Sequence, residues 1–212
     1  MCIQQRKIFL IGFHGQTLAH DPDEGRTHQL GDGAALGQAT GRDVVWDFRT
    51  DDMKAGGQGA PLAPFFHHAL ARMCEFNEPV AFLTLGGVAN VTWVDLTSAL
   101  PEAEGALLAF DTGPANALLD DFLSETAGVA FDKGGAVAAK GTVFRPLYDE
   151  LAHVEYLKKP APKSLDRDAF SGFLEKLKRP SPEDGAATLT EITAGCIARS
   201  LPPYAVIIRT TA

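Results

Sequence analysis

The sequence predicts a mixed α/β fold, and three observations support this prediction. Short runs of β-branched and aromatic residues recur along the chain at the length of a strand. Glycine-rich or proline-rich loops and helical stretches separate these runs, which is the alternation expected of α/β proteins. The 212 residues are 45% hydrophobic and 22% charged, which is enough apolar material for the cores of one or two domains.

Residues 1–78 form the first predicted domain. Both of its predicted strands end in polar residues, and its first predicted helix is rich in alanine and glycine, so that it would pack closely on a sheet. In chain order, the predicted elements are a strand at Lys7–Gly12, a loop of little periodicity over residues 13–30, a helix at Gly31–Thr40, a strand at Asp43–Arg49, an irregular glycine-rich segment at Gly56–Pro61 and a helix at Leu62–Glu75.

Residues 79–212 form the second predicted domain. It begins with two apolar runs that the Gly86-Gly87 turn separates, as in a hairpin, and it becomes mostly helical after Pro114. The predicted elements are strands at Val80–Leu85, Val88–Val94 and Ala106–Phe110, helices at Asn116–Thr126, 136–154, Arg167–Lys178 and Pro182–Ser200, the last one capped by Ser181, and a buried strand at Tyr204–Ile208. No helix follows to cover this last strand, so we expect the chain to be truncated.

Charge and cysteine content narrow the class of protein. A net charge of −8 disfavours a nucleic-acid or anionic-membrane surface, which needs clustered basic residues. Cys2, Cys74 and Cys196 are odd in number and far apart, which favours a reducing cytoplasm over a disulfide framework. The last two lie on apolar faces of predicted helices, where buried inert thiols are expected. The sequence predicts no metal site, no membrane-spanning segment and no signal peptide.

The most informative motif is AFDTGPANALL, residues 109–119. We expect Asp111 at the carboxyl end of a strand and Pro114 in the first turn of a helix, where its missing N–H costs nothing. Free N–H groups of Thr112, Gly113 and the first helical turn would then accept an anionic group, and the Asp111 carboxylate could take a proton from a nucleophile. The alternative is that Asp111 and Thr112 only cap the helix.

Three further polar segments follow apolar runs: the first holds His14 and Gln16, the second Asp47 and Arg49, and the third Gly86, Gly87 and Asn90. In open α/β sheets, ligands bind at the carboxyl ends of the strands, so these segments could line one cleft. His14 and Gln16 would bond a polyhydroxylated ligand, Arg49 a carboxylate, and the two glycines phosphate oxygens. The alternatives are a capped loop histidine, a surface pair of Asp47 with Arg49, and simple turns.

Six segments in this order closely resemble the 1,6-anhydro-N-acetylmuramate kinases of bacterial cell-wall recycling: GFHGQTLAHDP, TGRDVVWDFRTDDMKAGGQGAPLAPFFH, TLGGVANVTWV, AFDTGPANALLDDF, FDKGGAVAAKG and PAPKSLDRDAF. The resemblance runs from about Leu10 to Ser200. It implies the two-lobe, ribonuclease-H-like fold of the sugar kinase, actin and Hsp70 superfamily, incomplete in this chain, with the sugar held between the lobes.

The resemblance also implies a reaction: ATP phosphorylates O6 of the anhydro sugar while water opens the 1,6-anhydro ring, giving N-acetylmuramate 6-phosphate. Asp111 matches the catalytic aspartate. His14, Gln16, Asp47, Arg49 and Gln58 match the sugar-facing part, and Gly86, Gly87, Asn90 and Gly113 match the phosphate- and nucleotide-binding part. ATP and Mg²⁺ are the implied cofactors. The implied setting is the cytoplasm, without nucleic acid or membrane, and with a homodimer as an alternative to the monomer.

The family pattern is not complete here. The glycine-rich hairpin that precedes these segments in the family, and the Gly-Gly-Gly loop after the strand at Tyr204–Ile208, are not matched, so we expect weak activity or none. Two alternatives differ in class: a sugar-binding protein without turnover, and a related sugar kinase with another substrate. Binding that survives Asp111→Asn favours the first, and equal affinity for neutral and lactyl-bearing sugars favours the second.

Overall fold

The computed structural model describes residues 8–165, 170–177, 180–201 and 206–210. Its strands and helices form the mixed α/β structure that the sequence predicts. The chain divides into two compact units, Met1–Leu62 (unit 1) and Ala63–Ala212 (unit 2). This division precedes the expected boundary at Pro79 because helix α3 (Ala63–Met73) packs on the sheet of unit 2, where its Ala71 lies in a cluster with Val80 and Phe82.

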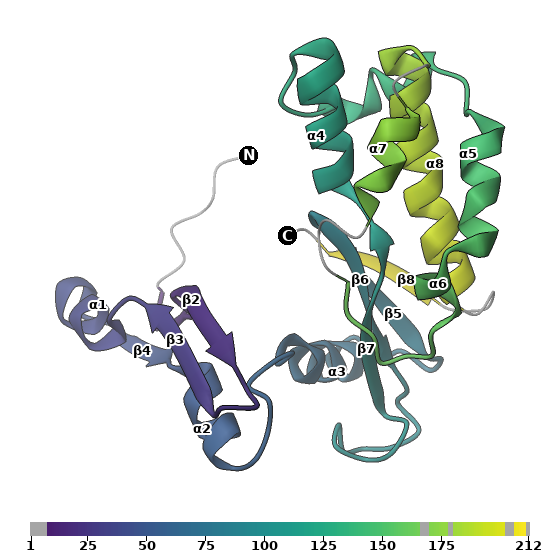
Figure 1. The fold of residues 1–212 in the computed structure, drawn as a ribbon. Coiled ribbons are helices and arrows are strands. Elements are labelled where there is room, and N and C mark those ends of the chain that lie inside the picture. The colour runs from purple at the N-terminus through teal and green to yellow at the C-terminus, as the bar shows by residue number, and fades with distance from the viewer. Residues whose placement is uncertain (1–7, 166–169, 178–179, 202–205, 211–212) are drawn as a thin grey trace. The chain divides into compact units, whose positions relative to one another are not determined.

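Unit 1 contains two short two-stranded sheets and two helices (Figure 1). Strands β1 (Leu10–Phe13) and β4 (Asp43–Trp46) are parallel, whereas β2 (Gln16–Asp21) and β3 (Arg26–Leu30) form an antiparallel hairpin. The helices are α1 (Gly33–Thr40) and α2 (Phe48–Lys54). The Asp32 carboxylate caps α1 by accepting bonds from the N–H groups of Ala34 and Ala35, and Gly41 ends the helix in the left-handed conformation.

Two predictions for unit 1 are wrong. Residues 13–30 are not a loop but contain the β2–β3 hairpin, whose turn includes Gly25 at φ 63°. Both strands carry many polar side chains, so the apolar alternation that marks a strand is weak. The strand predicted at Asp43–Arg49 ends at Trp46, because Asp47 takes a left-handed conformation and α2 begins at Phe48.

Unit 1 buries little of its own apolar surface. None of the described apolar side chains between residues 8 and 62 is buried, and large ones such as Phe9, Leu18 and Trp46 are exposed. Burial of apolar surface is the main favourable contribution to folding. Unit 1 therefore gains little stability from its own packing, in contrast to unit 2.

Unit 2 is built on a four-stranded sheet of order β7-β6-β5-β8. Strands β5 (Val80–Leu85), β6 (Val88–Val94) and β7 (Leu107–Pro114) are antiparallel neighbours, and β8 (Val206–Thr210) lies parallel to β5. The predicted β5–β6 hairpin is confirmed in position and pairing. Strand β8 overlaps the prediction for Tyr204–Ile208, but its Ile207 is 52% exposed, so this edge strand is not fully buried.

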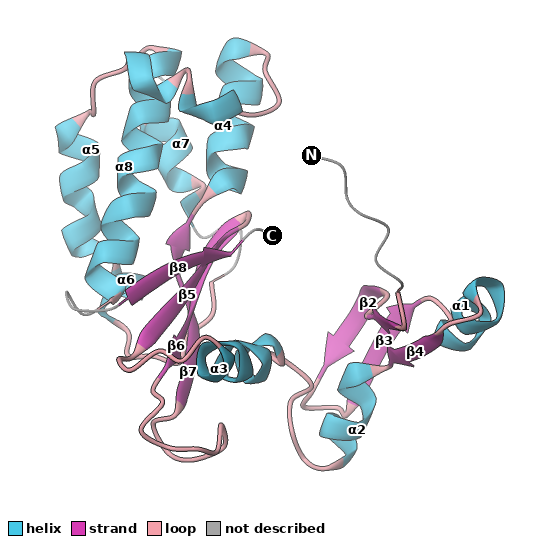
Figure 2. Cartoon of the chain, turned by 180° about the vertical axis from the view of Figure 1, so that it is seen from behind, coloured by secondary structure: helices cyan, strands magenta, loops and turns pink. Residues whose placement is uncertain are grey.

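The helices of unit 2 form a second core. In Figure 2, α4, α5, α7 and α8 lie together at one end of the sheet. Buried side chains from these helices, among them Phe122, Leu147 and Ile192, form one cluster. The elements are α4 (Asn116–Ala127), the 3₁₀ turns η1 (Lys133–Gly135), η2 (Ala138–Lys140) and η3 (Glu150–His153), and helices α5 (Arg145–Asp149), α6 (Glu155–Lys158), α7 (Gly172–Lys176) and α8 (Pro182–Ser200).

The helix predictions hold at two places and fail at a third. Helices α4 and α8 lie where they are predicted, and the Ser181 hydroxyl caps α8 by accepting from the N–H of Asp184 at 3.1 Å. The helix predicted over 136–154 is instead broken into the 3₁₀ turn η2 and a separate helical stretch of α5 and η3, because Gly141 between them is extended and packs against the Glu183 carbonyl at the start of α8.

Cys196 is buried in the core of unit 2 as expected, and burial raises the pKa of its thiol to about 11. Cys74 lies beyond the end of α3 and is exposed, contrary to the prediction. Expectations for five residues fall outside the described ranges: Cys2, Lys7, Arg167, Lys178 and Tyr204.

Candidate functional site

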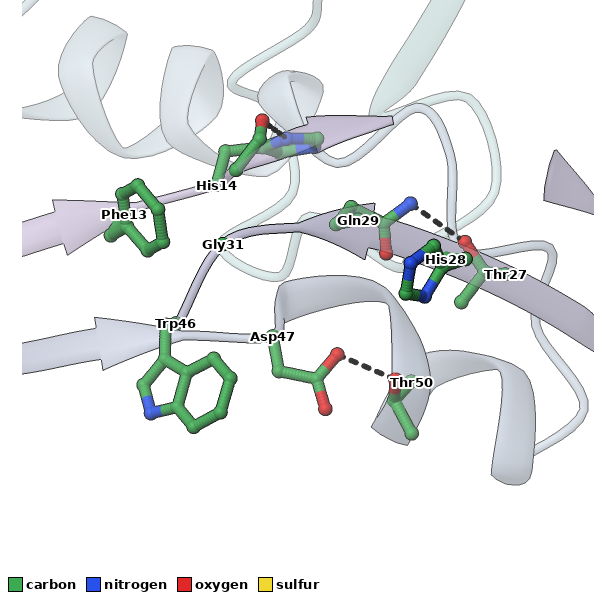
Figure 3. Close-up of a pocket in the computed structure, with 10 residues that line it drawn as sticks. Phe13, His14, Thr27, His28, Gln29, Gly31, Trp46, Asp47 and Thr50 are labelled. Atoms are coloured by element: carbon green, nitrogen blue, oxygen red, sulfur yellow. Dashed lines mark hydrogen bonds between the residues drawn. The ribbon is translucent and has the colours of Figure 1, made fainter. Parts of the chain in front are cut away.

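A pocket of about 220 Å³ in unit 1 collects side chains from the ends of β1, β3 and β4 (Figure 3). Strands β1 and β4 are parallel, and Phe13 pairs with Trp46. The next residues, His14 and Asp47, therefore emerge at the same edge of the sheet, as expected for the carboxyl ends of parallel strands. The lining residues are Phe13, His14, Gly15, Thr27, His28, Gln29, Gly31, Trp46, Asp47 and Thr50.

Hydrogen bonds order three polar side chains at this pocket. Arg49 Nε donates to His14 Nε2 at 3.3 Å, so the His14 proton lies on Nδ1, which is 3.0 Å from the Gly15 carbonyl. Asp47 accepts from the Thr50 hydroxyl at 2.5 Å and has φ 56°, a conformation that Asp adopts more readily than most residues. Among the ion pairs of the described residues there is none between Asp47 and Arg49, so they are not a surface pair.

Two predicted sugar-facing residues lie away from the lining of this pocket. Gln16 is exposed on β2, and Gln58 is exposed in the loop that precedes Gly59. The N–H of Gly59 donates to Asp52 at 2.6 Å, which fixes the loop rather than the Gln58 side chain.

Thr27, His28 and Gln29 of β3 also line the pocket but escaped the sequence analysis. These three residues belong to the β2–β3 hairpin, and the Pro-Asp-Glu-Gly sequence of its turn at 22–25 is typical of turns. This turn sequence could have indicated the hairpin.

Asp111 lies within strand β7, not at its end. The strand continues to Pro114, and α4 begins only at Asn116, so the prediction that Pro114 starts the helix is wrong. Proline is tolerated here because β7 is an edge strand. Asp111 pairs with Asn90 and Gly113 with Ala89, which leaves Thr112 as an extra residue in a β-bulge. Bulges bend a strand and redirect its side chains, and this bulge directly follows Asp111.

One distant segment contacts Asp111 at three points. The N–H of Asp111 donates to the Lys163 carbonyl at 3.0 Å, its carbonyl accepts from the Tyr156 hydroxyl at 2.7 Å, and its Oδ2 accepts from the N–H of Leu165 at 2.8 Å. Burial raises the pKa of the Asp111 carboxyl, and the bond from Leu165 opposes this shift. The carboxylate is therefore held by the bond from Leu165, and the other two bonds hold the Asp111 backbone. The sequence instead predicts that a helix N-terminus lies beside the carboxylate.

The Gly86-Gly87 turn binds the start of α4. The N–H groups of Ala115 and Ala117 donate to the Gly87 carbonyl at 3.2 Å, and that of Asn116 donates to the Gly86 carbonyl at 3.0 Å. The N–H groups of Ala115, Asn116 and Ala117 at the start of α4 are thus occupied rather than free for an anion. Outside the strand pairing, the N–H groups of Gly86 and Gly87 themselves have no acceptor among the described residues.

Gly113 has a packing role. A Cβ at this position would lie 2.6 Å from Cβ and 2.8 Å from Sγ of Cys196 in α8, so only glycine lets β7 and α8 approach this closely. Asn90 is half-buried opposite Asp111. The assignment of these residues to phosphate binding stays a prediction.

Neither a metal cluster nor a membrane span is found in the part of the chain that the structure describes. No group of three or more His, Cys, Asp and Glu side chains could hold a metal ion there, and no helix is long and apolar enough to cross a membrane.

Comparison with known proteins gives a consistent result. The family model for anhydro-N-acetylmuramic acid kinase matches residues 2–209. Anhydro-N-acetylmuramic acid kinase 1 of Jannaschia sp. (strain CCS1) is 54% identical over 92% of this chain and 52% of the relative. The kinase of Ruegeria sp. (strain TM1040) is 52% identical over the same shares, and that of Zymomonas mobilis is 50% identical over 92% of this chain and 50% of the relative. The chain thus spans about half the length of these curated relatives.

Proposed function

Because this chain belongs to the anhydro-N-acetylmuramic acid kinase family, we propose that it binds 1,6-anhydro-N-acetylmuramate and, with weak activity, transfers the γ-phosphate of ATP to O6 of this sugar. Water opens the anhydro ring in the same reaction, and the products are N-acetylmuramate 6-phosphate and ADP. The role is peptidoglycan recycling in the cytoplasm. The observation that carries the proposal is the ordered, half-buried carboxylate of Asp111.

Asp111 is the general base of the proposed reaction. It removes a proton from the water whose oxygen attacks the anomeric carbon, the bond from that carbon to O6 breaks, and O6 takes the γ-phosphate. Burial raises the pKa of this carboxyl above its ordinary value. The shift supports the assignment because a general base is most effective when its pKa approaches the working pH.

The pocket of unit 1 supplies the sugar contacts. His14 and Asp47 line it, and Arg49 bonds His14 through Nε. The terminal guanidinium nitrogens of Arg49 have no partner among the described residues, which leaves them for a carboxylate such as the lactyl group of muramic acid. Gln16, on strand β2, and Gln58 remain proposed sugar contacts outside the lining of this pocket.

The N–H groups of Gly86 and Gly87, with Asn90 beside Asp111, are the proposed phosphate contacts in unit 2, and Gly113 is a proposed nucleotide contact that also lets α8 approach β7. These groups fit a phosphate, since N–H donors suit its oxygens. Mg²⁺ would arrive on ATP and neutralise phosphate charge; phosphates and water supply most of its ligands, so no large protein cluster is needed.

The sheet of unit 2 supports the proposed ribonuclease-H-like lobe. Its three antiparallel strands lead through a helical crossover to a parallel fourth strand. For the oligomeric state, the proposal includes both a monomer and a homodimer.

Calorimetry and product analysis test the proposal. The purified chain is titrated with 1,6-anhydro-N-acetylmuramate and with Mg-ATP, and N-acetylmuramate 6-phosphate is measured by mass spectrometry. We expect Asp111→Asn to abolish product formation, and Asp23→Asn, at an exposed turn residue, to leave both sugar binding and product formation unchanged. Absence of sugar binding by the parent chain would contradict the proposal.

A sugar-binding role without turnover is the second candidate. It is favoured by the hydrogen bonds from the first turn of α4 to the Gly86 and Gly87 carbonyls, which occupy donors that a phosphate could otherwise use. Sugar binding by the parent without heat from Mg-ATP and without product would establish this role in place of the kinase activity.

A further inference from the structure

We propose that the segment Tyr156–Leu165 is a positioning element that fixes the Asp111 carboxylate by its Oδ2 and leaves Oδ1 as the oxygen that accepts the proton. The inference rests on the proposed role of Asp111 as general base. It adds residues 45 to 54 positions away in the sequence to the machinery around this carboxylate.

The first argument is the number of bonds that this one segment makes. Asp111 has three polar groups that can be tied, its N–H, its carbonyl and its carboxylate, and the segment binds each of them. Strand β7 is the edge of the sheet, so its outer N–H and carbonyl groups would otherwise face solvent. The segment covers this edge at Asp111 itself.

The second argument is that the segment is fastened to itself and to the core. Lys163 Nζ donates to the Tyr156 carbonyl at 3.2 Å and lies 4.7 Å from the centroid of the Tyr156 ring. Tyr156 and Leu165 pack against the helical core of unit 2. Burial raises the pKa of the Tyr156 hydroxyl, so this group remains protonated and continues to donate to Asp111. The donors are therefore held in place before any ligand binds.

The third argument concerns the two carboxylate oxygens. Oδ2 accepts the 2.8 Å bond from Leu165, whereas no hydrogen bond to Oδ1 is found among the described residues. A bond to one oxygen restricts rotation of the carboxylate plane and stabilises its charged form. The oxygen without a partner is then the one that can meet a water proton. Fixing this geometry in advance is a recognised way to lower a reaction barrier.

The decisive variant is Leu165→Pro, which removes the N–H donor to Oδ2. Leu165→Val is the matched control, because it changes the side chain but keeps the N–H. The carboxyl carbon of Asp111 is followed by ¹³C NMR as a function of pH in both proteins. We expect the pKa of Asp111 to rise in Leu165→Pro and to stay at the parent value in Leu165→Val. An unchanged pKa in a folded Leu165→Pro protein would overturn the proposal.

A second variant covers the case in which Leu165→Pro does not fold. Tyr156→Phe keeps the ring and its contact with Lys163 but removes the hydroxyl that bonds the Asp111 carbonyl. We expect faster hydrogen exchange at the Asp111 amide, with no change at the amide of Phe82 in the central strand β5. Tyr148→Phe removes a hydroxyl in α5 and serves as the control. Equal exchange of the Asp111 amide in Tyr156→Phe and Tyr148→Phe would refute the tie through Tyr156.

Turnover separates this inference from the proposed function. In the kinase assay, Tyr156→Phe should lower kcat about 10- to 100-fold with KM little changed, because a misplaced base affects the chemical step more than sugar binding. If the parent forms no product, the kinase proposal and the catalytic role of the segment both fail, whereas the pKa and exchange results still decide whether the segment positions Asp111. If the parent is active and Tyr156→Phe matches it, the positioning role alone is refuted.

Discussion

Replacing Gly113 by alanine should destabilise unit 2 through a single contact. The new Cβ would lie 2.6 Å from Cβ and 2.8 Å from Sγ of Cys196, while ordinary van der Waals contact begins at 3.4 Å. Strand β7 and helix α8 would have to separate by about 0.8 Å at this point. Over-packing of this kind costs about 1–3 kcal/mol in the free energy of unfolding.

Urea unfolding followed by fluorescence measures this cost. The chain has two tryptophans, of which Trp93 lies on β6 in unit 2 and Trp46 in unit 1. A Trp46→Phe background therefore makes the signal report on unit 2 alone. Gly172→Ala is the control, because nothing lies within 4 Å of a Cβ at that helical position. It should be neutral or stabilising by up to about 1 kcal/mol.

A double-mutant cycle identifies the partner. Cys196→Gly removes both atoms that the new methyl group meets, so Gly113→Ala should cost less in that background than in the parent, with a coupling energy of about 0.5–3 kcal/mol. Unchanged stability of Gly113→Ala, together with loss of Mg-ATP binding, would refute the packing explanation and assign Gly113 to the nucleotide.

Three further predictions concern unit 2. Phe82→Ala should lower the free energy of unfolding by about 3–5 kcal/mol because the ring is fully buried. The control is Phe66→Ala, at a ring that is 66% exposed, and its free energy of unfolding should stay within about 0.5 kcal/mol of the parent value. The midpoints of urea unfolding measure both effects. The rings of His67 and Phe82 are stacked with their centroids 4.5 Å apart, and burial lowers the pKa of His67. As pH drops below the ordinary value of 6.5, the unfolded state therefore binds a proton before the folded state does, and the free energy of unfolding should fall. This fall should be steeper in the parent than in His67→Phe. Burial raises the pKa of Asp111, so the folded state keeps its proton to a higher pH than the unfolded state does. As pH rises from about 4 to about 7, the melting temperature of Asp111→Asn should therefore increase relative to that of the parent. The asparagine amide oxygen can still accept the bond from Leu165. The opposite trend would mean that this hydrogen bond affects the pKa of Asp111 more than burial does.

Sequence predicted the position of a site residue where neighbouring residues in the chain determine it, and failed where distant segments do. His14 and Asp47 could be placed at one sheet edge from sequence because each directly follows an apolar run and parallel strands share an edge. Thr27, His28 and Gln29 reach the same pocket through a hairpin whose polar strands gave little periodic signal. The Asp111 motif was recognised, but its environment was not, because its partners lie in Tyr156–Leu165.

Sequence alone determined the features that depend on neighbours along the chain. The β5–β6 hairpin, the Ser181 cap and the span of α8 follow from apolar runs, a glycine turn and a capping residue within a few positions of each other. Three features depend on the tertiary structure: the end of β7, the close packing against α8 that requires glycine at position 113, and the hydrogen bonds that hold Asp111. In each of these cases the deciding energy is a contact or hydrogen bond between residues far apart in the chain, which no local pattern encodes.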